Sequence, residues 1–218
     1  MLNRISLRCV ASVAVVCLFL PAFAEGAAKT PLLNRRVSIS TESSSVTQYL
    51  LTLFNKAGIH GGVAIVNEQC QEAVEQFPEF EGDLRGALEK LASTGHDLHW
   101  LEVGDSLVVH NTPSPPPILM VLVRQFQFSR KEALTKSSSN LLDAPEVSAK
   151  VQSLHLVERG PELGFAQLQQ PTTPQDIVTL TNTTVIDALN NMAGNHAVWL
   201  YKESRCERNI MSLNWPVR

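Results

Sequence analysis

The sequence predicts an α+β protein: two small β-α-β-β modules, with helices packed on mainly antiparallel sheets, joined by a proline-rich linker. Short segments that alternate apolar and polar residues, typical of half-buried strands, are interspersed with segments whose apolar residues recur at helical spacing. Residues 112–117 read Thr-Pro-Ser-Pro-Pro-Pro, and such a run joins neither a helix nor a central strand. It divides an N-terminal module, 35–111, from a C-terminal module, 118–218.

The composition is that of an ordinary folding-competent chain. Of its 218 residues 44% are hydrophobic and 18% are charged, with a formal net charge of −3. Nucleic-acid binding calls for a basic patch and usually a high pI, whereas the pI of this sequence is about 6.1. The composition therefore argues against a nucleic-acid partner.

Residues 1–24 have the pattern of a secretory signal peptide. Arg4 and Arg8 form a basic start, an apolar run follows over 10–20, and Ala22-Phe23-Ala24 is a typical cleavage signal. A membrane anchor is the alternative, but the apolar run is shorter than the roughly 20 residues that a spanning helix needs. We expect cleavage after Ala24, a periplasmic or secreted protein, and no membrane insertion of the mature chain.

The N-terminal module begins with an expected strand, helix and strand. Residues 36–40 alternate apolar and polar side chains, as a strand with one buried face does. Ser45 and Gln48 form a capping box for a helix that runs to Gly58, and 62–66 is a second strand.

The same module should close with an edge strand, a helix and a hairpin. Residues 73–81 alternate, but Pro78 cannot donate to a ladder, so an edge position is expected. Asp83 caps a helix that ends at Gly95. Two further strands, 98–103 and 106–110, flank Gly104-Asp105, which is a two-residue turn signal.

The C-terminal module opens with a long strand over 118–128. Ser129 and Glu132 form a capping box for a helix, and Pro145 suits the first turn of another. Residues 157–175, rich in Pro, Gly and Gln, are expected to be a loop.

The end of this module repeats the order strand, helix, strand, strand. Residues 176–180 are the first strand, Thr184 and Asp187 open the helix, and the last two strands are 197–201 and 209–215. Its helix also carries an Ala-Leu-x-x-Met-Ala pattern that matches Ala-Leu-x-x-Leu-Ala at 87–92, with a tryptophan following in both copies. Either the chain contains a duplication, or this is a pattern common to amphipathic helices.

Residues 37–110 resemble the secretin and TonB short N-terminal domain. The resemblance rests on five segments: Val37-Ser-Ile-Ser40, Val46 to Gly58, Gly62-Val-Ala-Ile-Val66, Phe80-Glu-Gly-Asp-Leu84 with Ala87-Leu88, and Gly104-Asp-Ser-Leu-Val-Val109. A weaker copy is expected at 176–215. The resemblance implies a small α+β unit that serves as a periplasmic signalling or docking module, here free-standing because neither a receptor barrel nor a secretin pore follows it.

Two cysteines remain after the leader is removed. In an oxidising compartment Cys70 and Cys206 are either joined to each other or separately buried. A bridge would close a loop of more than a hundred residues. We expect the disulfide, and with it two modules held against each other.

The search for chemistry finds no catalytic residue, cofactor site or metal site. His96 and His99 lie three apart, so in a strand they point to opposite sides and no cysteine or carboxylate pattern accompanies them. The serines lack a nucleophile motif, and Gly61-Gly62 is too short for a phosphate loop. The tryptophans and Tyr201 alternate along strands and are expected to pack in the core.

Three functions remain open at this point. The first is a non-enzymatic interaction module that docks to an envelope protein partner through a sheet edge or a helix face. The second is a small-molecule binding protein with a cleft between the modules. The third, a hydrolase, is disfavoured by the missing motifs.

Overall fold

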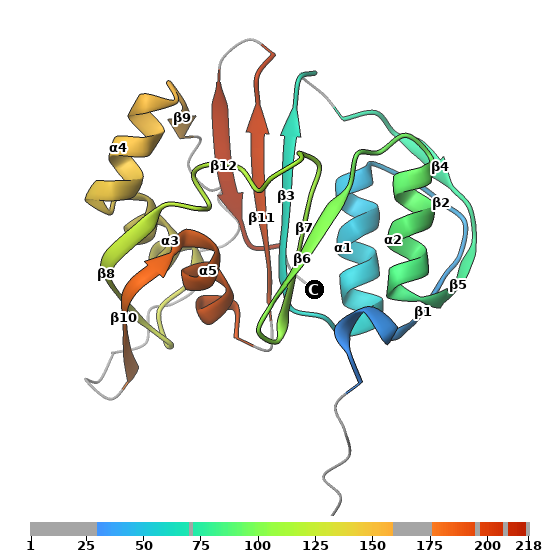
Figure 1. Cartoon of the computed structure of the whole chain (residues 1–218), viewed down its shortest axis with the longest axis horizontal. Coiled ribbons are helices and arrows are strands. Elements are labelled where there is room, and N and C mark those ends of the chain that lie inside the picture. The colour runs from blue at the N-terminus through green and yellow to red at the C-terminus, as the bar shows by residue number, and fades with distance from the viewer. Residues whose placement is uncertain (1–29, 70–71, 159–175, 195–196, 207–208, 217–218) are drawn as a thin grey trace, which may run out of the picture.

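A six-stranded sheet at the centre of the molecule contains strands from both halves of the chain (Figure 1). The computed structural model describes residues 30–69, 72–158, 176–194, 197–206 and 209–216, so the expected signal peptide lies outside the described residues. The sheet is ordered β6 (His99–Val103), β7 (Ser106–His110), β3 (Gly61–Asn67), β11 (Val198–Ser204), β12 (Ile210–Asn214) and β9 (Val157–Glu158). The α+β class is confirmed.

The N-terminal half covers one face of this sheet with two helices, α1 (Val46–Ala57) and α2 (Leu84–Ser93). Their caps are the expected ones: the side chain of Ser45 accepts the Gln48 N–H, and that of Asp83 accepts the Gly86 N–H. Outside the helices lies an antiparallel pair, β1 (Arg36–Ile39) and β5 (Phe80–Asp83). A short helix, η1 (Leu32–Asn34), precedes β1.

The C-terminal half covers the opposite face with α3 (Leu134–Leu142), α4 (Pro145–Ser153) and α5 (Val185–Ala193). Thr184 caps α5 as expected, since its side chain accepts the Asp187 N–H. Here too an antiparallel pair, β8 (Leu122–Ser129) and β10 (Ile177–Thr184), lies beyond the helices.

The two halves share one topology, so each strand of the central sheet and of the outer pairs β1–β5 and β8–β10 has a counterpart, here called its twin. The pair β1–β5 corresponds to β8–β10, and the set β6-β7-β3 corresponds to β11-β12-β9, with the same parallel and antiparallel relations. Details match as well: the first helical N–H of α2 bonds to the carbonyl of Arg35, and that of α5 bonds to the carbonyl of Val121. These agreements favour the duplication over a chance helix pattern.

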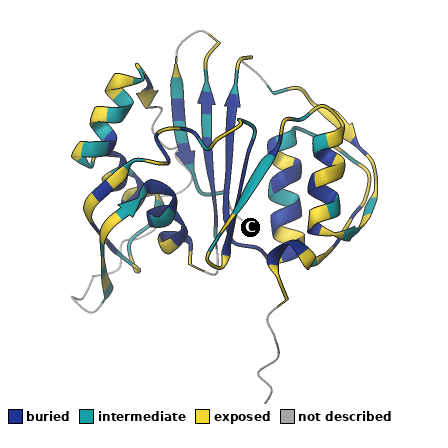
Figure 2. Cartoon of the chain, in the orientation of Figure 1, coloured by how far each residue is buried: buried dark blue, intermediate teal, exposed yellow. Residues whose placement is uncertain are grey.

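The halves are related by a half turn about an axis that runs across the strands, followed by a shift of three strands. Strand order is kept, but β11 runs parallel to β3 whereas its twin β6 runs antiparallel to it. The helical layer also changes face, because Val63 and Ile65 pack with α1 and α2, while Trp199 and Tyr201 pack with α3 and α5. Figure 2 shows the central strands dark blue between the two helical layers.

The pairing of β3 with β11 changes the domain picture that the sequence suggested. Residues 112–117 lie outside helices and strands, as expected of a connector. They do not separate two independent sheets, however, since β3 and β11 form a parallel ladder from Gly61 and Val198 to Asn67 and Ser204. Each half keeps its own helical layer, and each face of the common sheet has its own hydrophobic core, to which strands of both halves contribute.

Several expected boundaries were wrong. The strand expected over 73–81 is divided at Pro78 into β4 (Glu75–Phe77), which pairs with β2 (Glu42–Ser44), and β5. The helix expected from Ser129 and Glu132 begins only after Ala133, because Ser129 is still paired with Ile177 in the β8–β10 ladder. The strand expected from 118 begins at Leu122, after a turn.

Other differences lie in the last third of the chain. Strand β10 runs to Thr184, beyond the expected end at 180. Of the expected loop over 157–175, Val157 and Glu158 form β9, and the rest lies outside the described residues. Among the helices of the described ranges, none has the length and apolar character that crossing a membrane requires.

Candidate protein-docking edge

Strand β6 forms one outer edge of the central sheet, and in the described chain its only strand neighbour is β7. The turn Gly104-Asp105 sets which backbone groups face outward. In a two-residue hairpin the closing pair, here Val103 and Ser106, is hydrogen-bonded, and pairs alternate from there. Trp100 and Glu102 therefore direct their N–H and C=O groups away from β7, toward the open edge.

The side chains of β6 fix it firmly to the rest of the fold. Trp100 packs against the core of the N-terminal half, whereas Leu101 and Val103 pack against that of the C-terminal half. Glu102 is exposed. The edge is thus held in place by both cores, and its unpaired backbone groups are of the kind to which a further strand binds.

The twin of β6 carries such a strand. β11 pairs with β12 on one side, as β6 does with β7, and on its other side binds β3 in parallel through seven residue pairs. At this junction Trp199 lies opposite Gly62, and a Cβ at Gly62 would come within 2.0 Å of the indole ring. The junction depends on glycine because the backbone of β3 approaches the buried indole closely.

The opposite end of the sheet is the short strand β9, the twin of β3. The Val157 N–H donates to the Asn209 carbonyl at 2.6 Å, so Val157 directs its backbone groups toward β12 and Glu158 directs its own outward. Val157 is 53% exposed. Burial and the neighbouring Asp143 raise the pKa of Glu158.

Charged side chains gather where β3 and β11 end side by side. We call this set the strand-end cluster; it consists of Glu68, Glu72, Lys202, Glu203 and Arg205. Glu72 accepts hydrogen bonds from Thr47 of α1 at 2.5 Å and from Asn67 of β3 at 3.2 Å, and pairs with Lys202 of β11 at 3.1 Å. The cluster therefore ties the two halves together.

The surroundings of the cluster shift the pKa of Glu72 and that of the neighbouring Tyr201. Burial alone would raise the pKa of Glu72, but hydrogen bonds from Thr47 and Ser45 and the ammonium of Lys202 leave that pKa lowered. Burial and the adjacent Glu203 raise the pKa of Tyr201, whose hydroxyl donates to Glu203 at 2.9 Å. Glu203 is only 5% exposed and also accepts from Arg205 Nε at 2.8 Å.

The sequence singled out Cys70 and Cys206, and the structure describes the second of them. Cys206 follows β11 by two residues, with its Sγ 3.3 Å from Ser204 Oγ, whereas Cys70 lies outside the described residues. The segments that lead to them are neighbours, because Ser204 pairs with Asn67 and the Arg205 N–H donates to the Asn67 carbonyl at 2.9 Å. Their pairing remains a prediction.

The histidines form local contacts. His96 lies 3.2 Å from Glu75, and His99 lies 3.0 Å from Asp97 while its ring stacks on that of His110. Burial lowers the pKa of His110. Over the described ranges, no three His, Cys, Asp or Glu side chains are grouped so that they could hold a metal ion.

The strand aromatics pack in the cores, as expected. Trp199 is fully buried and its Nε1 donates to Asn190 at 2.8 Å, and Tyr201 is 1% exposed. Trp100 and Trp215 are partly buried against the two cores. They form no exposed platform for a sugar or a base.

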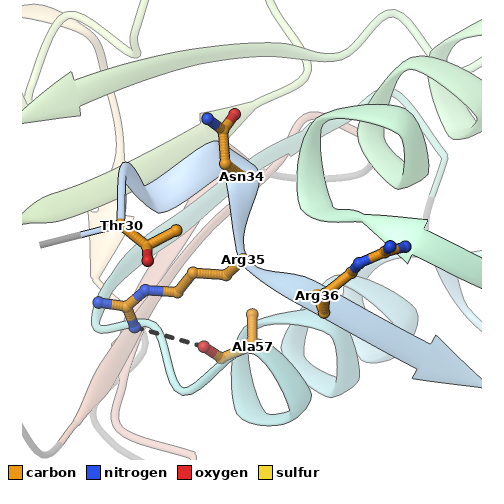
Figure 3. Close-up of a pocket in the computed structure, with 5 residues that line it drawn as sticks. All are labelled: Thr30, Asn34, Arg35, Arg36 and Ala57. Atoms are coloured by element: carbon orange, nitrogen blue, oxygen red, sulfur yellow. Dashed lines mark hydrogen bonds between the residues drawn. The ribbon is translucent and has the colours of Figure 1, made fainter.

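Two of the cavities lined by described residues each lie within one half of the chain. One, of about 470 Å³, is lined by Thr30, Asn34, Arg35, Arg36 and Ala57 (Figure 3). Arg35 donates there to the carbonyls of Ala57 and Gly58 at 3.3 and 2.6 Å, which caps the end of α1. The other, of about 310 Å³, is lined by Pro117, Leu154, Glu203, Arg205 and Asn209, from the connector and the C-terminal half.

No family model, curated protein or solved structure matches this chain. A function therefore has to be proposed from the fold and from the open edge of β6. The sequence did not identify β6 as a docking edge. The one signal that could have done so was the repeated helix pattern with its tryptophan, because it indicates that β6 and β11 are equivalent strands. The open edge of β6 stands out only when it is compared with the edge of β11, which pairs with β3.

Proposed function

We propose that this protein is an exported, non-enzymatic docking module of the cell envelope that binds a strand of a partner protein at the outer edge of β6. The observation that carries this proposal is a difference between the two twins β11 and β6. β11 pairs with the parallel strand β3 along one edge, and the corresponding edge of β6 has no strand beside it in the described chain.

The comparison of twins also distinguishes β6 and β9 from the edges of the outer pairs; β2 and β4, which pair with each other in the described chain, have no twin to compare. Strands β1, β5, β8 and β10 have one neighbour each in the described chain, and each of their twins is equally open. Only β6 and β9 have twins, β11 and β3, that bind a strand at the corresponding edge of the described sheet. The pairing of β11 with β3 supports the proposal that the corresponding edge of β6 binds a strand.

Strand addition suits a module without catalytic groups. The outward N–H and C=O groups of Trp100 and Glu102 can each bond to an added strand, and each such bond contributes about 0.5–1.5 kcal/mol. Specificity then comes from the side chains on either face of the added strand. The resemblance of residues 37–110 to the secretin and TonB short N-terminal domain supports docking in the periplasm as the setting.

A proline at position 102 tests the docking edge. Glu102 is exposed and directs its N–H outward, so Glu102→Pro removes an outward donor and leaves the ladder with β7 intact. Glu102→Ala is the matched control, since it also lacks the carboxylate but keeps the N–H. The exported protein is used as bait in envelope extracts, and a thermal melt of each variant checks that it is folded.

We expect wild type and Glu102→Ala to capture the same envelope protein and Glu102→Pro to lose it. The partner should also protect the amides of Trp100 and Glu102 from hydrogen exchange. Equal capture by a folded Glu102→Pro variant would refute docking at β6. The mass of the same exported protein reports whether it begins after Ala24.

A further inference from the structure

We infer that the strand of the partner protein runs parallel to β6 and carries a glycine opposite Trp100. This inference rests on the proposed function, because it states the direction and the chemistry of the strand that the docking edge binds. It follows from Trp100, which occupies in β6 the place that Trp199 occupies in β11.

The two tryptophans agree in position and in the face of the sheet on which they lie. Each is the second residue of its strand, and each strand pairs antiparallel with the strand that follows it. Trp100 packs with the helices of its own half, as Trp199 does in the other half, and the next residue, Leu101 or Leu200, packs on the opposite face. The indoles therefore lie on equivalent faces.

Their backbone groups also point to equivalent edges. The N–H of Arg205, directly after β11, bonds to the Asn67 carbonyl of β3, and every second residue of a strand faces the same neighbour. Trp199 therefore directs its N–H and C=O toward β3. The hairpin turn after β6 sets the groups of Trp100 outward in the same way. An added strand can thus bond to Trp100 as β3 bonds to Trp199.

The central junction defines the strand that fits such an edge. The strand beside Trp199 is parallel, and the residue opposite the indole is Gly62. A Cβ at this position would lie within 2.0 Å of the ring, so a side chain there is excluded. A partner strand placed on β6 by the same relation has its glycine opposite Trp100.

The burial of the two strands differs as an open edge predicts. Trp199 is fully buried and Tyr201 is 1% exposed, whereas Trp100 is partly buried and Glu102, the counterpart of Tyr201, is exposed. Both tryptophans pack with a helical layer, but in the described sheet β11 has a strand on either side and β6 has one neighbour. A partner strand supplies the second side to Trp100.

Two peptides test the requirement for glycine. One copies residues 60–68, which include β3, and the matched control has alanine in place of Gly62. Each is titrated against the wild-type protein and against its Trp100→Leu and Glu102→Pro variants, with the amide resonances of β6 as the readout. Thermal melts show that each variant is folded.

A nitroxide on the N-terminus of the glycine peptide tests the direction of the strand. Parallel binding brings the label to the start of β6 and broadens the amide resonances near His99. Antiparallel binding brings it to the other end of the strand and broadens those near Gly104.

We expect the glycine peptide to bind wild type in the parallel direction and the alanine peptide to bind about tenfold more weakly. Trp100→Leu should reduce this preference to less than about threefold, because it removes the ring that the methyl group meets. Glu102→Pro should bind neither peptide, because it lacks an outward donor.

Four results overturn the inference: no binding of the glycine peptide, equal binding of the two peptides, antiparallel binding, or a preference that Trp100→Leu leaves unchanged. Self-association of the wild type in sedimentation velocity, abolished by Glu102→Pro, would make a second copy the occupant and would overturn it as well. If Glu102→Pro still loses envelope capture in any of these cases, docking at β6 stands, and only the direction and chemistry of the partner strand fail.

Discussion

Replacing Gly62 with alanine tests the close contact on which the junction of the two halves depends. The added methyl group would lie 2.0, 2.1 and 2.2 Å from three atoms of the Trp199 ring, whereas carbon atoms in contact are about 3.5–4.0 Å apart. The indole has no free space to enter, because Trp199 is fully buried. It is also held by its hydrogen bond to Asn190 at 2.8 Å.

The expected cost has two parts. Forcing a methylene-sized group into a packed core costs about 1–3 kcal/mol, and displacing the indole from Asn190 costs a further 1 kcal/mol or so. The free energy of unfolding should therefore fall by about 2–4 kcal/mol. For a chain of this size the melting temperature should fall by about 4–16 °C.

Urea unfolding of four proteins measures this cost: wild type, Gly62→Ala, Trp199→Leu and the double variant. Leucine removes the ring that the methyl group meets, so Gly62→Ala should cost at least about 1 kcal/mol less in that background. An alanine variant within about 0.5 kcal/mol of wild type, or a cost unchanged by Trp199→Leu, would refute the steric account of the junction.

Two other predictions concern the strand-end cluster, and a third concerns the two cysteines. Glu72→Gln should lower the free energy of unfolding by about 1–2 kcal/mol at pH 7. The folded-state pKa of Glu72 is lowered, so the carboxylate stabilises the fold above about pH 4.5, and this stabilisation is lost as the pH falls through the lowered pKa. Urea unfolding should therefore show a smaller difference in the free energy of unfolding between wild type and Glu72→Gln at pH 3 than at pH 7. An equal difference at the two pH values contradicts the prediction. Glu203→Leu should lower the free energy of unfolding by about 1–3 kcal/mol, because it leaves the buried Tyr201 hydroxyl without its acceptor. Replacing the exposed Glu68 with glutamine is the control and should lower it by less than about 1 kcal/mol. Similar losses for the two variants would argue against the buried contact. Thiol alkylation of envelope-purified protein should label Cys70 and Cys206 only after reduction, and the bridge should stabilise the fold by about 4–5 kcal/mol; labelling before reduction would end this prediction.

Local interactions could be predicted from the sequence because their partners lie within a few residues. Ser45, Asp83 and Thr184 each cap the helix that the sequence assigned to them, since the accepted N–H is three residues away. The Gly104-Asp105 hairpin is also where it was expected, because a two-residue turn fixes the register of its own strands. The Ser129–Glu132 box failed for a non-local reason: pairing with Ile177 keeps Ser129 in a strand.

The sequence by itself determined the capped helices, the hairpin, the α+β class and the repeated order of elements. Only the tertiary structure decided that β3 pairs with β11, that the helical layers lie on opposite faces, and that β6 and β9 are left as open edges. Gly61-Gly62, too short for a phosphate loop, turned out to be the close approach to Leu107 and Trp199. The choice of a distant partner strand leaves no local pattern in either segment, because every residue except proline offers the same backbone N–H and C=O groups.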